Sequence, residues 1–144
     1  MFKLTGAVLI MLSTVFISSQ KILELWFTYR FLQQTADIIQ KLIYEKDLNT
    51  VYGKIFDKWN FDYTCFINLA KSNGYIKRSE INYVNSFFYG LGRHNSAAEE
   101  KYLYDSLKAV IQRKDEYYLN YRKNKKLHIL CGAAAGMLII IFLI

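Results

Sequence analysis

The C-terminal stretch from Tyr121 to Ile144 constrains the fold more than any other part of the chain. It opens with four closely spaced cations and continues as an almost wholly apolar run; the cations are Arg122, Lys123, Lys125 and Lys126. A helix of about 20 residues crosses a hydrocarbon core ~30 Å thick, and about 17 is near the lower limit. Residues 127–144 therefore predict a membrane helix. The cations would lie among the lipid headgroups, where each attracts anionic lipid by about 1 kcal/mol.

A second apolar stretch runs from Leu4 to Ser19. A cleaved signal peptide is the competing interpretation, with Lys3 as its basic region. The cleavage pattern argues against it, because the large Ile17 stands two places before Ser19, where a small residue is expected. We therefore predict an uncleaved membrane helix over residues 1–21. A secreted helical domain with a cleaved N-terminus stays open as an alternative.

The middle of the chain, residues 22–126, has the composition of a helical domain. The whole sequence is 53% hydrophobic, has no proline and only 7 glycines, and so favours long helices. The net charge of +7 lies mainly beside the apolar ends, because residues 21–116 hold 14 Lys and Arg against all 12 acids. A nucleic-acid-binding domain would need a basic face. We therefore expect no nucleic-acid partner.

Apolar residues at three- and four-residue steps predict a first helix that continues from the apolar stretch to about Glu45. Further helices are expected over residues 51–59, 61–71 and 77–91, and from Ala97 into the terminal run. Asn73-Gly74 predicts a helix end, because both residues tolerate the left-handed conformation. The predicted fold is all-α: an antiparallel helical bundle whose N- and C-terminal helices extend side by side as a two-helix transmembrane hairpin.

A glycine-containing turn precedes the last helix. Gly92 is interpreted as a helix C-cap, and Asn95 or Ser96 as the next N-cap. Ser96 and Glu99 fit a capping box, in which the glutamate reaches back to the serine amide. A phosphate-binding loop is the functional alternative, but the spacing of its glycines, lysine and hydroxyl residue is missing.

No pattern of catalytic or metal-ligating residues stands out. His94 lies in the turn without a partnered acid, so we interpret it as a surface histidine. Cys131 lies in the terminal apolar run, so we expect no structural disulfide with Cys65. Both cysteines are interpreted as small buried apolar side chains. We expect a non-enzymatic protein without cofactor or metal.

The predicted membrane hairpin has an element that helices use to pack in lipid. Gly132 and Gly136 form a Gly-x-x-x-Gly element with alanines between them, and Gly6 and Ala7 are the candidate partners. Small residues allow close backbone approach, which holds helices together where the hydrophobic effect is weak. The cations adjoin the middle region, so the positive-inside rule predicts a cytoplasmic bundle with both chain ends across the cell membrane.

Several segments, taken in order, resemble the stage III sporulation protein AB family. The opening looks like the family's Lys-x-x-Gly-Ala, and the glycine turn resembles its Leu-Gly-x-x-Asp, with Asn95 in place of the acid. The segments that carry the resemblance are Lys3-Leu4-Thr5-Gly6-Ala7, Leu42-Ile43-Tyr44, Ile76-Lys77 with Glu80, Leu91-Gly92-Arg93-His94-Asn95, Lys101, Lys123, Lys126 and Gly132.

The resemblance implies a function as well as a layout. Family members are similar to the platform protein of type II secretion and type IV pilus machines, with a helical domain facing the cytoplasm. They belong to the channel between mother cell and forespore. The implied partners are the stage III sporulation protein AA ATPase, which the protein would couple to the membrane assembly, and other channel proteins. Self-association is left open, and a generic membrane-anchored helical interaction protein is the alternative.

Overall fold

The computed structural model describes residues 2–46, 62–93 and 96–143. Within these ranges the chain forms α1 (Phe2–Lys46), α3 (Tyr63–Ser72), α4 (Arg78–Gly90) and α5 (Ser96–Leu143), with no strand. The all-α prediction is therefore confirmed, and each of these helices begins and ends within two residues of its expected position. The helix expected over residues 51–59 lies outside the described residues.

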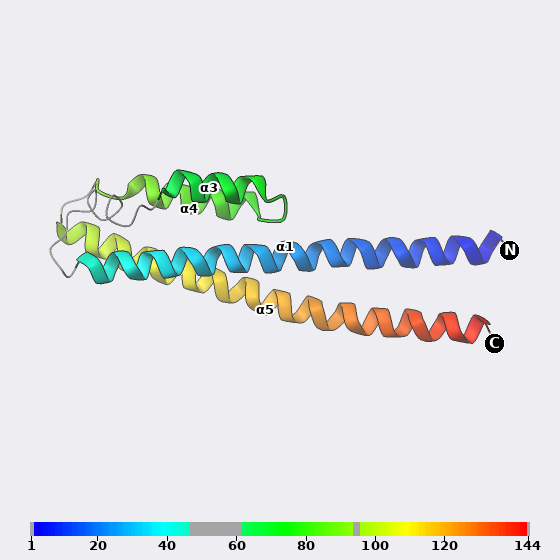
Figure 1. The fold of residues 1–144 in the computed structure, drawn as a ribbon. Helices are drawn as coiled ribbons and strands as arrows, with labels where there is room; N and C mark the ends of the chain where they lie inside the picture. The colour runs from blue at the N-terminus through cyan, green and yellow to red at the C-terminus, as the bar shows by residue number, and fades with distance from the viewer. Residues whose placement is uncertain (1, 47–61, 94–95, 144) are drawn as a thin grey trace.

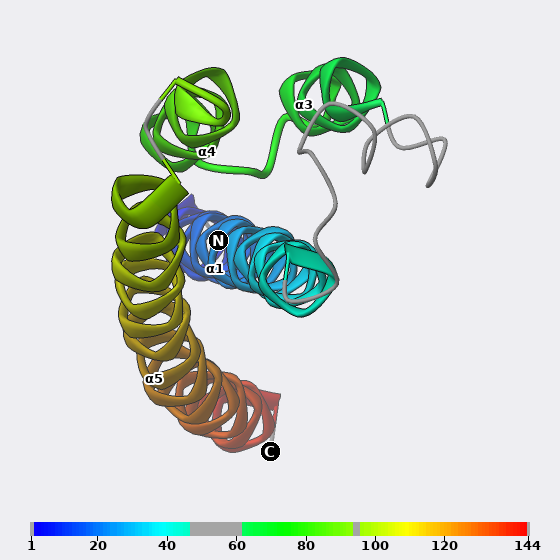
Figure 2. The same ribbon diagram turned by 90° about the vertical axis from the view of Figure 1, so that its left-hand side faces the viewer.

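The helices form two layers. The two long helices α1 and α5 run antiparallel and make up one layer, while α3 and α4 lie over the half that is remote from the chain termini (Figure 1). Seen from the end, α4 lies above the α1–α5 pair and α3 lies beside it, over α1 (Figure 2). Both views show α1 and α5 separating towards the two termini. The described structure is thus a helical bundle with two projecting helical ends.

The core lies between the two layers in the half remote from the termini. Leu32, Ile39 and Leu42 of α1 are fully buried, as are Val84 of α4 and Leu103 of α5. The seven- and three-residue spacings of the α1 residues place them on one helix face. Burying a side chain of this size contributes about 1.5–3 kcal/mol each. The other buried apolar members of the core are Phe31, Ala36, Ile67, Ala70, Ile81, Phe87, Phe88 and Val110.

The ends of α3 are fixed by side chains close in sequence. The Asp62 carboxylate accepts hydrogen bonds from the backbone N–H groups of Thr64 (2.8 Å) and Cys65 (3.2 Å). Hydrogen bonding from the Thr64 side chain and from these two amides holds the pKa of Asp62 below its usual value. The predicted end at Asn73 is confirmed, but its backbone is extended (φ −79°, ψ 103°) rather than left-handed. The Asn73 side chain instead accepts a hydrogen bond from the Tyr75 N–H at 3.0 Å.

The glycine turn between α4 and α5 differs from the prediction in its cap residue and in one bond. Gly92 has φ +77°, but α4 ends at Gly90 and its C-cap residue is Leu91, so Gly92, the predicted C-cap, lies one position beyond it. The carboxylate of Glu99 is only 1% exposed and accepts a hydrogen bond from the Gly92 N–H at 2.8 Å. Glu99 thus ties the turn to the first turn of α5. Asn95, His94 and the side chain of Ser96 lie outside the described residues.

Candidate functional site

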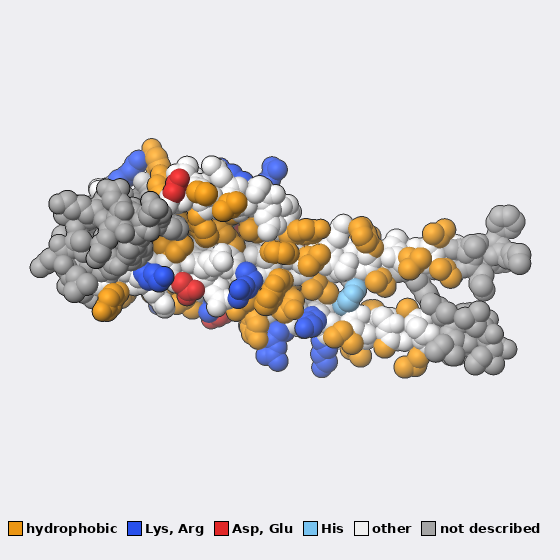
Figure 3. Space-filling view, viewed as in Figure 1, with side chains coloured by type: hydrophobic (Ala, Val, Ile, Leu, Met, Phe, Trp, Pro, Cys, Tyr) orange, Lys and Arg blue, Asp and Glu red, His pale blue; other side chains and the backbone are white. Residues whose placement is uncertain are grey.

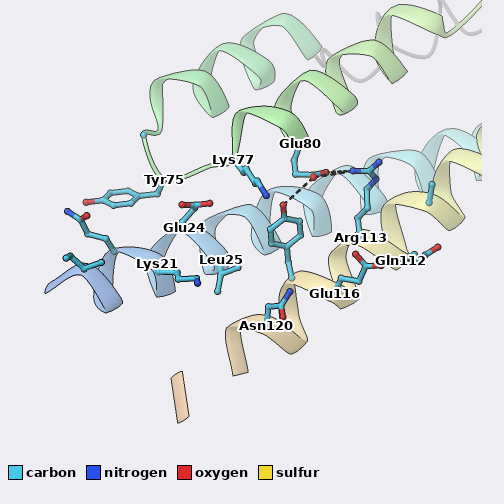
Figure 4. A pocket seen from close by; sticks show the side chains of 15 residues that line it. Lys21, Glu24, Leu25, Tyr75, Lys77, Glu80, Gln112, Arg113, Glu116 and Asn120 are labelled. Carbon is cyan, nitrogen blue, oxygen red and sulfur yellow. Dashed lines mark hydrogen bonds and ion pairs between the residues drawn. The ribbon is translucent and has the colours of Figure 1, made fainter. Parts of the chain in front are cut away.

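A polar cleft of about 1090 Å³ opens between α1, α4 and α5, beneath the turn that joins α3 to α4. Figure 4 shows side chains from all three helices facing it. Its charged lining is balanced, with three cations and three acids; they are Lys21, Glu24, Lys77, Glu80, Arg113 and Glu116. The described lining therefore carries no net charge.

The centre of the cleft is a buried carboxylate. The side chain of Glu80 is 7% exposed and that of Arg113 is 41% exposed; their closest N–O distance is 3.0 Å. Arg113 Nη1 donates to both carboxylate oxygens, at 3.2 and 3.0 Å, and the Tyr117 hydroxyl donates to Oε1 at 3.3 Å (Figure 4). Burial and the adjacent Glu80 charge raise the pKa of Tyr117 to about 12, because both disfavour the phenolate. These bonds join α4 to α5.

The start of α4 is also joined to α1. The buried hydroxyl of Thr28 accepts a hydrogen bond from the Lys77 N–H at 3.0 Å, and Lys77 is the N-cap residue of α4. No side chain caps this helix end locally. Thr28 therefore satisfies a backbone donor that would otherwise be unpaired in a partly buried position.

Four aromatic rings connect α1 and α5 where the two helices begin to separate; we call them the aromatic belt: Trp26, Tyr29, Tyr118 and Tyr121. The Trp26 ring lies 5.0 Å from that of Tyr121, and the Tyr29 ring lies 5.3 Å from that of Tyr118. Trp26 and Tyr29 are themselves 5.6 Å apart. The rings are partly exposed, so they are neither core residues nor isolated surface side chains.

The four predicted lipid-contacting cations are exposed along α5 next to this belt. The Arg122 guanidinium lies 5.9 Å from the ring of Tyr118, and the Lys125 ammonium lies 5.7 Å from the ring of Tyr121. Lys and Arg side chains gather on this part of the surface (Figure 3). Lys126 lines a shallow groove together with Arg122 and Lys125, whereas Lys123 does not.

One polar contact joins α1 and α5 beyond the belt. Ser18 Oγ lies 2.6 Å from His128 Nδ1 and also donates to the Val15 carbonyl at 2.9 Å. A hydroxyl has one proton to donate, so when both bonds form, His128 Nδ1 carries the hydrogen and donates to Ser18. This pair therefore links α1 to α5 where the two ends separate.

The predicted glycine contact is not formed among the described residues. A Cβ atom added at Gly6, Gly132 or Gly136 would meet nothing within 4 Å, because α1 and α5 have already separated at this level (Figure 1). The side chain of Ala7 lies outside the described residues. The structure thus does not bring the two small-residue patches together, and their role in helix packing stays a prediction.

The projecting ends carry many exposed apolar side chains, visible along both arms in Figure 3. They are Val8, Leu9, Leu12, Val15, Phe16 and Ile17 on α1, and Leu127, Ile129, Leu130 and Met137 on α5. Over the residues searched, which leave out uncertainly placed positions at both termini, no helix meets the length and hydropathy expected of a membrane-crossing segment. Cys65 and Cys131 are exposed free thiols, so their interpretation as buried residues was wrong.

Two arrangements were not apparent from the sequence. The pairing of Glu80 with Arg113 and Tyr117 spans more than 30 residues, and the pairing of Ser18 with His128 spans 110. Glu80 lies four residues before Val84 and seven before Phe87, on the buried face of α4. This spacing was the one sequence indication that Glu80 would be buried. Comparisons of the chain with protein-family models, curated proteins and solved structures gave no match.

Proposed function

We propose that the protein is a non-enzymatic membrane component, anchored by the projecting ends of α1 and α5, with the two-layer bundle acting as an interaction domain. The exposed apolar side chains of both ends are the observation that carries this proposal. Soluble proteins rarely leave apolar patches larger than a few hundred Å² in water. A bilayer would cover these side chains on all sides of both helices.

The order of side chains along the helices supports the same proposal. The aromatic belt and the cations lie between the packed bundle and the apolar ends, which is where such side chains concentrate at membrane surfaces. The apolar run of the sequence continues through residues 138–144, whose side chains are not described. With these residues included, the proposal keeps a two-helix transmembrane hairpin and a cytoplasmic bundle.

The more specific proposal follows from the resemblance to the stage III sporulation protein AB family. In it, the bundle contacts the stage III sporulation protein AA ATPase on the mother-cell side and links that ATPase to the membrane channel. The unbroken helix α5 supports a coupling role, because one helix runs from the bundle into the apolar end. A rigid helix can transmit a displacement that a flexible linker would absorb.

Membrane insertion is tested by fractionating cells and extracting the membranes with alkaline carbonate. We expect the chain to stay with the membranes, and complete release would contradict the anchor. Intact mass distinguishes the secreted alternative, since loss of about 19 N-terminal residues marks a cleaved signal peptide.

Topology is tested through the exposed thiol of Cys65 on α3. We expect a membrane-impermeant maleimide to label it in broken cells and not in intact ones, in a Cys131→Ser background with Cys65→Ser as the control. Labelling in intact cells would contradict a cytoplasmic bundle. Co-purification with the ATPase from sporulating cells, and failure of a null strain to complete spores, test the family assignment. A generic interaction protein would pass the membrane tests and fail these two.

A further inference from the structure

The groove on α5 next to the aromatic belt has the side chains of an anion site. It has a volume of about 420 Å³ and is lined by Tyr118, Tyr121, Arg122, Lys125, Lys126, Ile129 and Leu130. Small-molecule sites commonly have volumes of about 300–1,000 Å³. Three cations and no acid line it, in contrast to the balanced cleft on the other side of the helix pair. None of the three cations forms an ion pair with a described residue.

Two of the three cations contact rings that themselves pack against α1. Arg122 and Lys125 lie over the rings of Tyr118 and Tyr121, one turn earlier on the same helix. Those two rings contact Tyr29 and Trp26 of α1. Ordering a long cationic side chain costs conformational entropy when a ligand binds, and prior contact with a ring reduces that cost.

The apolar side chains of the groove identify the kind of anion. Ile129 and Leu130 follow the cations by one turn, are 60% and 57% exposed, and lead towards the apolar end of α5. A free phosphate would leave them in water, whereas a phospholipid would place its phosphate on the cations and an acyl chain on Ile129 and Leu130. We propose that this groove is a stoichiometric site for one anionic phospholipid, such as phosphatidylglycerol. The proposal rests on the membrane location proposed above.

Lys123 distinguishes such a site from general attraction to an anionic surface. It belongs to the same basic cluster and is exposed, but it does not line the groove. A diffuse field treats Lys123 and Lys125 nearly alike, because they lie only about 3 Å apart along the axis of α5. In a specific site, lipid binding depends on Arg122, Lys125 and Lys126, and replacing Lys123 leaves it unchanged.

The test is native mass spectrometry of the full chain in a neutral detergent, titrated with phosphatidylglycerol or with phosphatidylcholine carrying the same acyl chains. At about fivefold per cation, neutralising Arg122, Lys125 and Lys126 together by glutamine should weaken phosphatidylglycerol binding about a hundredfold. Lys125→Gln alone should weaken it about fivefold, and Lys123→Gln by less than about twofold. Circular dichroism checks that each variant keeps its helix content.

Three results would overturn the site: equal losses for Lys123→Gln and Lys125→Gln, equal binding of the two lipids, or full displacement of the lipid by an equal concentration of glycerophosphoglycerol. The last result would mean that the headgroup alone is recognised. Carbonate extraction reports separately on the anchor. A chain that resists extraction but shows no lipid preference refutes only the site, and a released chain that still prefers phosphatidylglycerol refutes only the anchor.

Discussion

Replacing Arg113 by methionine should destabilise the protein more than replacing its partner Glu80 by glutamine. The reason is the unequal burial of the pair: the Glu80 side chain is 7% exposed and the Arg113 side chain is 41% exposed. Without Arg113, a buried carboxylate keeps only the hydroxyl of Tyr117, at 3.3 Å. Without the Glu80 charge, Arg113 can still be hydrated, and a glutamine oxygen can still accept from it.

The size of the difference follows from these contacts. Removing one partner of a fully buried pair costs about 3–5 kcal/mol. Partial exposure of Arg113 and the remaining Tyr117 bond reduce this to about 2–3 kcal/mol for Arg113→Met. Glu80→Gln loses one charge-assisted bond and should cost about 1 kcal/mol. The double variant should cost less than the sum of the two, because the buried charge is gone when its partner is removed.

Urea unfolding of the full chain in neutral detergent, followed by circular dichroism, measures these free energies. Lys108→Met is the matched control, because Lys108 is an exposed cation on the same helix. It should change the free energy of unfolding by less than about 0.5 kcal/mol. A cost for Arg113→Met no larger than for Glu80→Gln, or strict additivity in the double variant, would refute the reasoning.

Three further predictions concern the α4–α5 junction and the cleft. Gly92→Ala should cost about 1 kcal/mol in urea unfolding, because its φ of +77° strains a residue with a Cβ although the space is open. Gly90→Ala should cost about 1–3 kcal/mol, since the new Cβ would meet the Tyr102 hydroxyl and displace it from its bond to the Phe87 carbonyl; an unchanged unfolding midpoint would contradict this. The pKa of Tyr117 is about 12 in the folded protein against 10.0 for the unperturbed side chain. Its contribution to the free energy of unfolding is therefore complete below pH 10 and is lost as the pH rises through 12. Tyr117→Phe should therefore reduce the alkaline loss of stability, measured by urea unfolding between pH 10 and pH 12.

The helices could be predicted from the sequence because their determinants are local. The seven- and three-residue spacing of Leu32, Ile39 and Leu42 defines an apolar face wherever the helix lies, and all three side chains are buried. A turn at Gly92 was likewise predicted from residue type, although the C-cap of α4 is Leu91, one position earlier. The capping-box pattern was insufficient for Glu99. It predicts a bond to the Ser96 amide, whereas the structure shows the Glu99 carboxylate accepting from the Gly92 N–H.

The candidate sites were less predictable, because they depend on which helix faces which. The cluster of cations on α5 was apparent from the sequence. The groove that three of them line was not, because it includes the rings of Tyr118 and Tyr121, which contact α1. The exposure of Cys65 and Cys131 was likewise mispredicted from residue type, since a cysteine is buried only where a second element covers its helix face.

The sequence by itself determined that this chain is helical, which faces of its helices are apolar, and that its cations adjoin apolar ends, because helix periodicity and composition are properties of neighbouring residues. Only the tertiary structure decided that Glu80 is buried against Arg113, that Ser18 meets His128, and that α1 and α5 separate before their glycines can touch. Contacts between residues far apart in the chain depend on the register and crossing of whole helices. Those are set by the packing of many side chains at once, and no single segment of sequence specifies them.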